Sequence, residues 1–338
     1  MTVDVHTHFV PETFPPMGDR PGGDRWPQMQ RLDAHTAQVM ISGRNFRTVT
    51  DECWSVERRL EGMEATGVSR EAVSPMPELL SYWAEAAPAR DFARQINEGI
   101  ARLVEQAPDR FSGLGMVPLQ DPDLAAAELA AVKALGLVGV EIGSNVEGRP
   151  IGDPRFLPFF QEAAAQGLAI FVHSFHPLGR ERLVGPGPLE NYVGFPLDQA
   201  FAVASLITGG VLERCGGARI ACSHGGGGLA MVLPRLNHGW SLSEALRQAL
   251  PRRPEEYARR LYFDTLVYDP RPLRYLLELV GASRLVVGSD YPFDIQEKPP
   301  GKALSEVADL APADREAITT GNALRFLGLT AVEAGIAP

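Results

Sequence analysis

Two histidines near the start of the sequence, His6 and His8, have the spacing of a pair of metal ligands. They belong to the run VDVHTHF at Val3–Phe9, in which we interpret Val3–His8 as a β-strand. Because successive side chains of a strand point to opposite faces, residues two positions apart lie on the same face. We therefore expect both imidazole rings to be directed at one point.

Three more polar residues directly follow later apolar runs in the same way. They are His173, His224 and Asp290. Four imidazoles and a carboxylate at the ends of strands are typical of a metal centre with an acid/base group beside it. A single histidine on an apolar strand is more often a packed core residue, so the prediction depends on the whole set.

The donor atoms of this set favour one divalent metal ion. His6, His8 and His173 offer neutral imidazole nitrogens and Asp290 offers an anionic oxygen, a combination that suits Zn²⁺ and also Mn²⁺ or Fe²⁺. Four protein ligands leave a position for a water molecule whose pKa the metal lowers. His224 is then the natural proton carrier, because the pKa of a free imidazole is near neutrality. The alternative for His224 is a role as a fourth imidazole ligand.

The scarcity of lysine argues against several other centres. The sequence has only Lys133, Lys298 and Lys302, and none of them ends a predicted strand. A binuclear centre bridged by a carboxylated lysine is therefore disfavoured, as are Schiff-base and pyridoxal phosphate chemistry. Glu141 leaves a second metal ion possible. The alternative interpretation is that Glu141 is a buried glutamate of the barrel interior without a metal.

Short apolar runs alternate with helical patterns along the chain, which predicts an α/β fold with a parallel sheet. Eight strands are expected, and they are Val3–His8, Glu71–Pro75, Phe111–Pro118, Val138–Gly143, Ala169–His173, Ala218–Ser223, Leu261–Leu266 and Leu285–Ser289. Helices are expected at Ser55–Thr66, Arg90–Gln106, Pro122–Leu135, Pro154–Gln166, Leu197–Arg214, Gly227–Leu250 and Pro272–Val280, with a final pair between Ala303 and Phe326.

The placement of the polar residues favours closure of this sheet into a (β/α)8 TIM barrel. The proposed ligands end the first, fifth and eighth strands, and barrel enzymes carry their active sites at that end of the strands. The first and eighth strands are neighbours in a barrel, whereas they would usually be far apart in an open doubly wound sheet. We expect residues 1–338 to form one barrel domain.

Two long segments are expected beside the barrel mouth. Residues 11–51 follow the first strand, are broken by prolines and glycines, and include a predicted hairpin at Gln38–Val49. A segment of this length is usually an insertion or a lid over the site. The second segment, Pro177–Pro196, follows the fifth strand.

The bulk composition excludes other classes of protein. The formal charge is −10 with no basic run, so a nucleic-acid surface is not expected. There is no glycine-rich dinucleotide or NTP fingerprint, and no organic cofactor is predicted. The three cysteines have no ligand-like spacing, and no stretch is long and apolar enough for a membrane span. We expect a cytoplasmic enzyme with a small-molecule carboxylate substrate and no membrane partner.

Several motifs taken together resemble a known family. They are VDVHTHFVP, NFR at Asn45–Arg47, VPLQDPDLA, VEIG, FVHSFHPLG, CSHGGGG, GSDYPF and the terminal GNALRFLGL. This pattern resembles the metal-dependent decarboxylase branch of the amidohydrolase superfamily, and within it the aminocarboxymuconate-semialdehyde decarboxylases. The likeness extends over nearly the whole chain.

The resemblance implies a distorted barrel with one divalent metal, usually Zn²⁺, held by His6, His8, His173 and Asp290. It implies His224 as catalytic acid/base, with Asp290 also open to a part in proton transfer. It also implies that Arg47 binds a substrate carboxylate, that Phe293 forms an aromatic wall, and that Arg235 reaches the neighbouring site of a homodimer.

The chain departs from the family pattern on the substrate side. The third histidine is followed by Ser174-Phe175-His176 where the family has a PWD motif, and a tryptophan of the next loop is replaced near Asn191-Tyr192. The metal chemistry carries over better than the identity of the substrate.

These observations predict a metal-dependent, non-oxidative decarboxylase of a small unsaturated or aromatic carboxylic acid. The alternative enzyme is a metal-dependent hydrolase of a lactone or an amide, since the same activated water could attack a carbonyl. A protein that uses the metal only for stability is the non-enzymatic alternative, and structural zinc sites are usually closed sites of cysteine and histidine.

Overall fold

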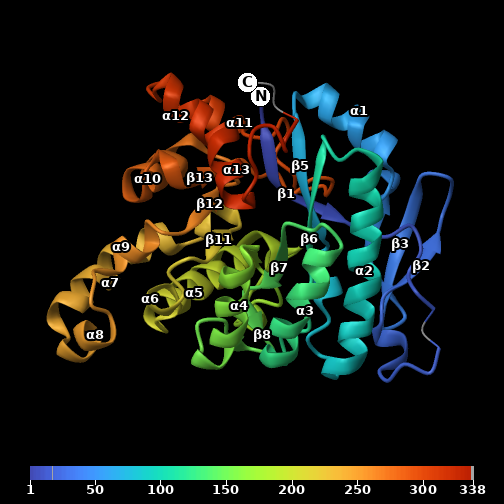
Figure 1. Cartoon of the computed structure of the whole chain (residues 1–338), viewed down its shortest axis with the longest axis horizontal. Helices are drawn as coiled ribbons and strands as arrows, with labels where there is room; N and C mark the ends of the chain where they lie inside the picture. Colours follow the sequence, from blue (N-terminus) through green and yellow to red (C-terminus); the bar gives the residue numbers. More distant parts are fainter. Residues whose placement is uncertain (17, 336–338) are drawn as a thin grey trace.

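A computed structural model of the chain describes residues 1–16 and 18–335. Its centre is a parallel sheet of eight strands, in which each strand pairs with the next along the chain (Figure 1). In spatial order these strands are β1 (Val3–Phe9), β5 (Arg70–Pro75), β6 (Phe111–Gly115), β7 (Gly139–Gly143), β10 (Ala169–His173), β11 (Arg219–Cys222), β12 (Tyr262–Asp264) and β13 (Leu285–Val286).

Backbone contacts between β1 and the segment that begins with β13 bring the two ends of the sheet together. Isolated parallel bridges join Asp4 to Val287 and Thr7 to Tyr291. The His8 amide also donates to the Tyr291 carbonyl at 2.7 Å. The sheet is therefore nearly closed into a distorted (β/α)8 barrel, which confirms the predicted fold and the order of all eight predicted strands.

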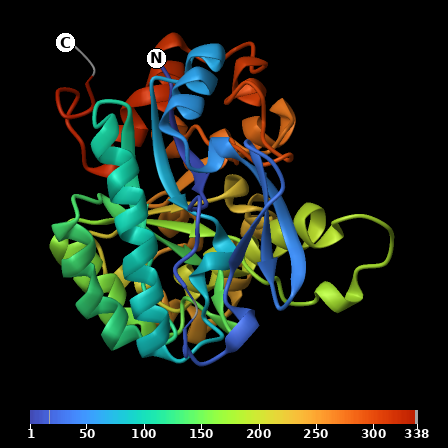
Figure 2. The ribbon, with the colours of Figure 1, turned by 90° about the vertical axis from the view of Figure 1, so that its right-hand side faces the viewer.

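The helices surround the barrel on its outer side (Figures 1 and 2). They are α1 (Val56–Thr66), α2 (Ala86–Gln106), α3 (Pro122–Ala134), α4 (Leu157–Gln166), α5 (Phe195–Thr208), α6 (Val211–Arg214), α7 (Leu229–Leu242), α8 (Glu244–Ala249), α9 (Pro254–Ala258), α10 (Pro270–Val280), α11 (Lys302–Ser305), α12 (Pro312–Glu316) and α13 (Asn322–Leu327).

Local sequence sets several of the helix ends. Ser55 caps α1 by accepting the Arg58 amide, and Asp121 caps α3 ahead of a proline at the first helical position. Gly67 ends α1 in the left-handed conformation, which costs glycine little. These signals explain why the predicted helix boundaries lie close to the observed ones for α1 and α3.

Other predicted elements differ from the structure. The predicted helix Gly227–Leu250 is divided at Ser243, which ends α7 and caps α8. The predicted strand Phe111–Pro118 ends at Gly115, and α9 was not predicted. Sequence periodicity detects a long apolar pattern but not the point at which the backbone turns within it.

Residues between β1 and α1 form a separate antiparallel sheet of β2 (Gln28–Arg31), β3 (Thr36–Ile41) and β4 (Arg44–Thr50). The predicted hairpin is β3–β4, and its turn residues Ser42 and Gly43 both have positive φ, as a two-residue hairpin turn requires. The third strand, β2, was not predicted. The segment between β10 and α5 projects beyond the same side of the barrel in Figure 2.

The interior of the barrel is apolar toward the amino-terminal ends of its strands. Val3, Val5, Leu114 and Phe171 pack there with residues of α13, including Phe326. This layer closes one end of the barrel, so polar side chains that point inward must lie toward the carboxyl ends of the strands.

Candidate metal centre

A register irregularity in β1 directs its histidines into the barrel. The pairing of β1 with β5 shifts between Asp4 and Thr7, and Val5 already belongs to the inner apolar layer. Such a bulge changes the face that the following residues occupy. His6 lies within the shifted stretch and His8 follows it, and both are fully buried.

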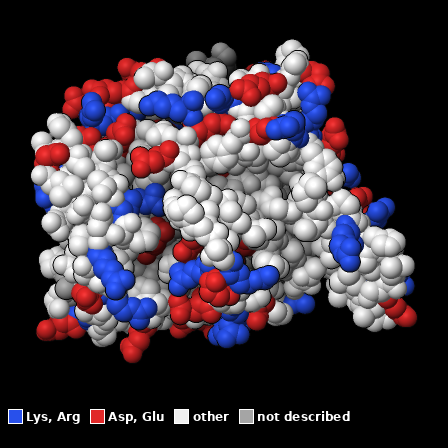
Figure 3. Space-filling view, turned by 180° about the vertical axis from the view of Figure 1, so that it is seen from behind, with Lys and Arg blue, Asp and Glu red and all other residues white. Residues whose placement is uncertain are grey.

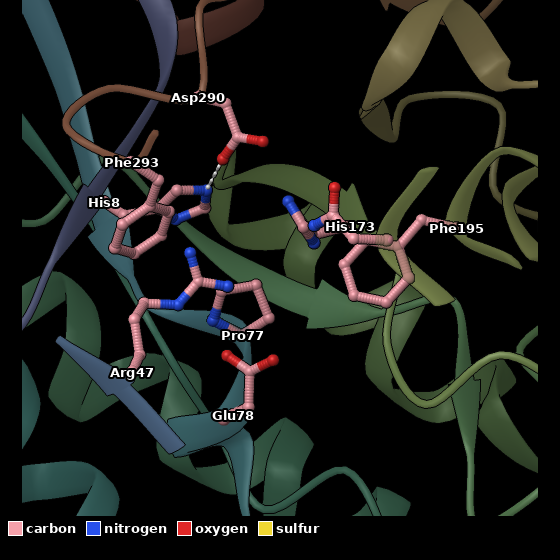
Figure 4. A pocket seen from close by; sticks show the side chains of 9 residues that line it. His8, Arg47, Pro77, Glu78, His173, Phe195, Asp290 and Phe293 are labelled. Carbon is pink, nitrogen blue, oxygen red and sulfur yellow. Dashed lines mark ion pairs between the residues drawn. The ribbon is translucent and has the colours of Figure 1, made fainter. Parts of the chain in front are cut away.

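The structure brings together four of the residues singled out in the sequence. The ligand atoms of His6, His8, His173 and Asp290, hereafter the four-residue group, all lie within 4.8 Å of one another. His8 Nε2 is 3.0 Å from Asp290 Oδ1 (Figure 4). His6 Nε2 is 3.7 Å from the same oxygen. This buried group fits a single divalent metal ion.

Hydrogen bonds on the far side of each ring set the orientation of the three histidines. His6 Nδ1 lies 2.7 Å from Asp264 Oδ2, and His8 Nδ1 lies 3.3 Å from the Pro75 carbonyl oxygen. His173 Nδ1 lies 2.7 Å from the Ser174 carbonyl oxygen. An Nδ1–H that donates there leaves the Nε2 lone pair free. All three Nε2 atoms are buried and have no hydrogen-bond partner among residues 1–16 and 18–335, as expected of metal ligands.

Burial keeps two of these rings neutral. It lowers the pKa of His8 to about 4 and that of His173 well below its usual value. Burial also lowers the pKa of His6, but the hydrogen bond with Asp264 and the charge of Asp290 outweigh it and raise this pKa to about 9. Without a metal, His6 therefore holds the proton that a bound cation must displace.

His224 stands next to the four-residue group at the start of the loop after β11. Its Nε2 is 3.8 Å from Asp290 Oδ2, and its side chain is 10% exposed. Its Nδ1 lies 3.1 Å from Ser223 Oγ. His224 and Asp290 both have positive φ, a backbone conformation that non-glycine residues adopt rarely and often at functional sites.

The glycines after His224 allow this loop to pack closely. A Cβ at Gly227 would lie 1.9 Å from the Pro196 carbonyl oxygen, and Gly227 also has positive φ. Only glycine fits both conditions. The loop that carries His224 is thus packed against the start of α5.

The four-residue group opens into a small pocket. Its walls include Arg47 from β4 and Phe293 from the segment after Asp290. The Phe293 ring stacks on His8 with ring centroids 5.1 Å apart, and the Arg47 guanidinium lies 4.1 Å from the centre of the Phe293 ring (Figure 4). Two of the three predicted substrate-side residues, Arg47 and Phe293, therefore line the pocket.

Comparison with known proteins agrees with this geometry. The family model described as Amidohydrolase matches residues 3–329. The chain belongs to the amidohydrolase family.

Similar proteins are decarboxylases by name. The amidohydrolase is 33% identical to the 2-amino-3-carboxymuconate-6-semialdehyde decarboxylase of Dictyostelium discoideum, over 97% of this chain and 92% of that protein. It shares the fold of Metarhizium anisopliae IDCase in its apo form, with a TM-score of 0.81, 22% identity and 97% coverage of both chains. The dihydroxybenzoic acid decarboxylase of Polaromonas sp. JS666, solved with manganese and 2-nitroresorcinol, gives a TM-score of 0.73, 23% identity and coverage of 97% and 96%.

Asp264 is a site residue of this amidohydrolase that sequence reasoning missed. It ends β12, is fully buried, and accepts the Gly225 amide through Oδ1 while Oδ2 faces His6. The signal was present, because Asp264 interrupts a predicted strand at the same level as the other polar residues. Aspartates also end strands for purely structural reasons, so the pattern alone did not distinguish it.

We expect Asp264→Asn to weaken metal binding by roughly 10–100-fold. The amide NH₂ would face His6 Nδ1–H, so the ring would have to change tautomer and lose the free lone pair on Nε2. The pKa of His6 would also fall. In the parent, we expect metal affinity to rise about tenfold per pH unit between pH 6 and 8, and this rise would become shallower in Asp264→Asn. Competition titration with a chelating dye measures both quantities.

The control for Asp264→Asn is Asp309→Asn, which removes a surface carboxylate paired with Arg274. It should leave both the metal affinity and its pH dependence unchanged. An Asp264→Asn protein with the metal affinity of the parent would show that this hydrogen bond does not support the centre.

Several other polar residues are not members of the four-residue group of the amidohydrolase. Glu141 is fully buried and accepts the Ser74 hydroxyl at 2.6 Å, and it is not one of the four residues that converge. Arg235 is exposed on α7 and does not line the pocket of its own chain. His35 pairs with Asp51 in the insertion, and His176 lines an outer cavity.

Two further findings concern the whole chain. Cys53, Cys215 and Cys222 are all buried and free. Among the described residues, no helix has both the length and the apolar character needed to cross a membrane.

Proposed function

We propose that this amidohydrolase is a metal-dependent, non-oxidative decarboxylase of a small unsaturated or aromatic carboxylic acid. The proposal depends on three buried Nε2 atoms that have no hydrogen-bond partner among the described residues and that lie close to Asp290, with His224 next to that carboxylate. The decarboxylase names of its relatives support the same reaction class.

In this proposal His6, His8, His173 and Asp290 hold the metal. When bound, a divalent ion supplies a positive charge that stabilises the negative charge developing as CO₂ leaves. The donor set of three imidazoles and one carboxylate favours Zn²⁺, with Mn²⁺ as the alternative that the Polaromonas relative contains. No organic cofactor is needed.

His224 and Asp290 form the proposed proton-transfer pair. Burial raises the pKa of Asp290, but the neighbouring imidazoles of His224, His8 and His6 outweigh burial and hold this pKa well below its usual value. Asp290 is therefore a poor acid, and we assign the proton to His224. The C–C bond to the carboxylate breaks, its electron pair stays on carbon, and this proton takes the place of the departing CO₂.

Arg47 and Phe293 are the proposed substrate contacts. The Arg47 Nε atom is buried and has no hydrogen-bond partner in the described part of the chain, so the guanidinium has a free donor at the pocket. A guanidinium can bind a substrate carboxylate with two parallel hydrogen bonds. Phe293 provides a flat apolar wall beside His8, suited to an unsaturated or aromatic acid.

We further propose that the protein is a cytoplasmic homodimer in which Arg235 reaches the neighbouring site. Exposed apolar side chains, Leu197 and Phe201 of α5 with Met231 and Val232 of α7, lie on two helices that pack together. Contiguous exposed apolar surface usually marks an interface. Figure 3 shows a wide face of the molecule with few charges. The free buried cysteines support a reducing compartment.

Co-expression of Arg235→Ala and His224→Ala chains tests this assembly. Each homodimer should be nearly inactive, but a mixed dimer has one site with an intact His224 and an intact Arg235 from its neighbour. Random pairing should restore roughly a quarter of the parent activity. A mixture no more active than its two parents would refute the contribution of Arg235 across the interface.

A panel of hydroxylated benzoic acids and unsaturated dicarboxylic acids, with lactones and amides alongside, tests the reaction. We expect metal-dependent CO₂ release from at least one acid, measured by trapping CO₂ and identifying the decarboxylated product. Release of a new acid from a lactone or an amide, without CO₂ from any member, would contradict the proposal and favour the hydrolase.

A further inference from the structure

Glu78 is an acidic side chain at the pocket that neither the metal centre nor the proton-transfer pair uses. It lies in the 3₁₀ turn Pro77–Leu80, which follows β5 at the barrel mouth. It points into the pocket from the side opposite Asp290 (Figure 4). Its Oε2 atom is buried and, within the described part of the chain, has no hydrogen-bond partner.

The neighbouring arginine does not satisfy this carboxylate. Arg47 lies over the Phe293 ring at 4.1 Å, and its own Nε atom also lacks a partner. Burial raises the pKa of Glu78, while the positive charge of Arg47 acts in the opposite direction. A buried acceptor without a partner is costly, so a structure that retains one commonly reserves it for a ligand.

Glu78 also stands at the junction of two spaces. The inner pocket beside His8 and Asp290 has a volume of only about 10 Å³. It shares Arg47, Glu78, Asn191 and Phe195 with an outer cavity of about 630 Å³, which the segment before α5 lines. A bound acid whose carboxylate is held near the metal centre must therefore extend past Glu78 toward the outer cavity.

We propose that Glu78 determines specificity by accepting a hydrogen bond from a hydroxyl or amino group at the end of the substrate remote from the departing carboxylate. This inference rests on the proposed decarboxylase function and names its substrate class. A carboxylate accepts hydrogen bonds and offers none, so it recognises a donor. It also disfavours a second carboxylate at that position, because like charges would face each other at short range.

Three acids with one core test this proposal, namely 2-hydroxybenzoate with an amino, a methoxy or a carboxylate group at position 4. Their binding is measured by calorimetry in the metal-loaded His224→Ala protein, in which turnover is suppressed. When Glu78 is present, we expect the 4-amino compound to bind about 10–100-fold more tightly than the 4-methoxy compound. The dicarboxylate should bind more weakly than either.

Two substitutions at Glu78 separate hydrogen bonding from charge. Glu78→Val should reduce the amino preference to within about threefold, because the acceptor is lost. Glu78→Gln keeps one acceptor, so it should retain part of the amino preference and lose the discrimination against the dicarboxylate. Glu278→Gln, at an exposed position on α10, is the matched control and should change nothing. Unchanged metal content in each variant excludes a general structural effect.

The outcomes distinguish the specificity of Glu78 from the function itself. Equal preferences in the parent and in Glu78→Val would overturn the role of Glu78, even if the native enzyme releases CO₂ from these acids. A preference for the amino group that disappears in Glu78→Val would support the role of Glu78 in specificity. This conclusion would hold even if none of the acids loses CO₂ and the decarboxylase proposal fails.

Discussion

His224→Ala is expected to keep its metal and to lose roughly 10²–10⁴-fold in kcat, the usual contribution of a positioned acid or base. His224 Nε2 lies 3.8 Å from Asp290 Oδ2, and His224 is outside the group of four that converges on one point. Its removal should therefore eliminate proton delivery while leaving every proposed ligand in place. Elemental analysis and steady-state kinetics on the same preparation measure the two effects.

The pH profile and a control separate this role from a structural one. The kcat–pH profile of the parent should contain a limb set by the proton donor, and the residual activity of His224→Ala should lack that limb. His238→Ala, at an exposed histidine of α7, should retain the parent rate and profile. Parent-like kcat in His224→Ala would rule out His224 as the proton donor.

Removal of the metal should have the largest effect of all, a complete loss of activity that added Zn²⁺ or Mn²⁺ restores. His173→Ala should lose activity in the same way, and excess metal should restore little of it because one of four ligands is absent. The three buried Nε2 atoms have no other partner, so metal should also stabilise the fold. A free metal concentration 1,000-fold above Kd adds about 4 kcal/mol to the free energy of unfolding.

Thermal unfolding with and without a chelator measures this stabilisation. The melting temperature should fall on chelation in the parent protein and change much less in His173→Ala. A chelated protein that retains both its activity and its melting temperature would contradict the metal-dependent account and favour a reaction carried by side chains alone.

The metal centre was predictable because its ligands follow a simple rule of parallel barrels. Polar residues at the ends of apolar strands meet at one end of the barrel, so the sequence allowed His6, His8, His173 and Asp290 to be placed together. The register shift between Asp4 and Thr7 could not be predicted, because a bulge depends on pairing with β5 rather than on local sequence.

The substrate side was less predictable because loops and turns build it. Glu78 lies in a turn after β5, and nothing in the run PMPELL marks it as a pocket residue. Arg47 and Phe293 were expected only through the family resemblance, and the structure places both on the pocket wall. Loop positions follow from tertiary packing that a single sequence does not encode in a periodic pattern.

The most direct test of the account is anomalous diffraction from crystals of the purified protein, combined with metal analysis. We expect one metal atom per chain and one anomalous peak, within bonding distance of the Nε2 atoms of His6, His8 and His173 and of an Asp290 oxygen. A peak elsewhere, or a catalytically active protein without any peak at these four side chains, would contradict the central claim.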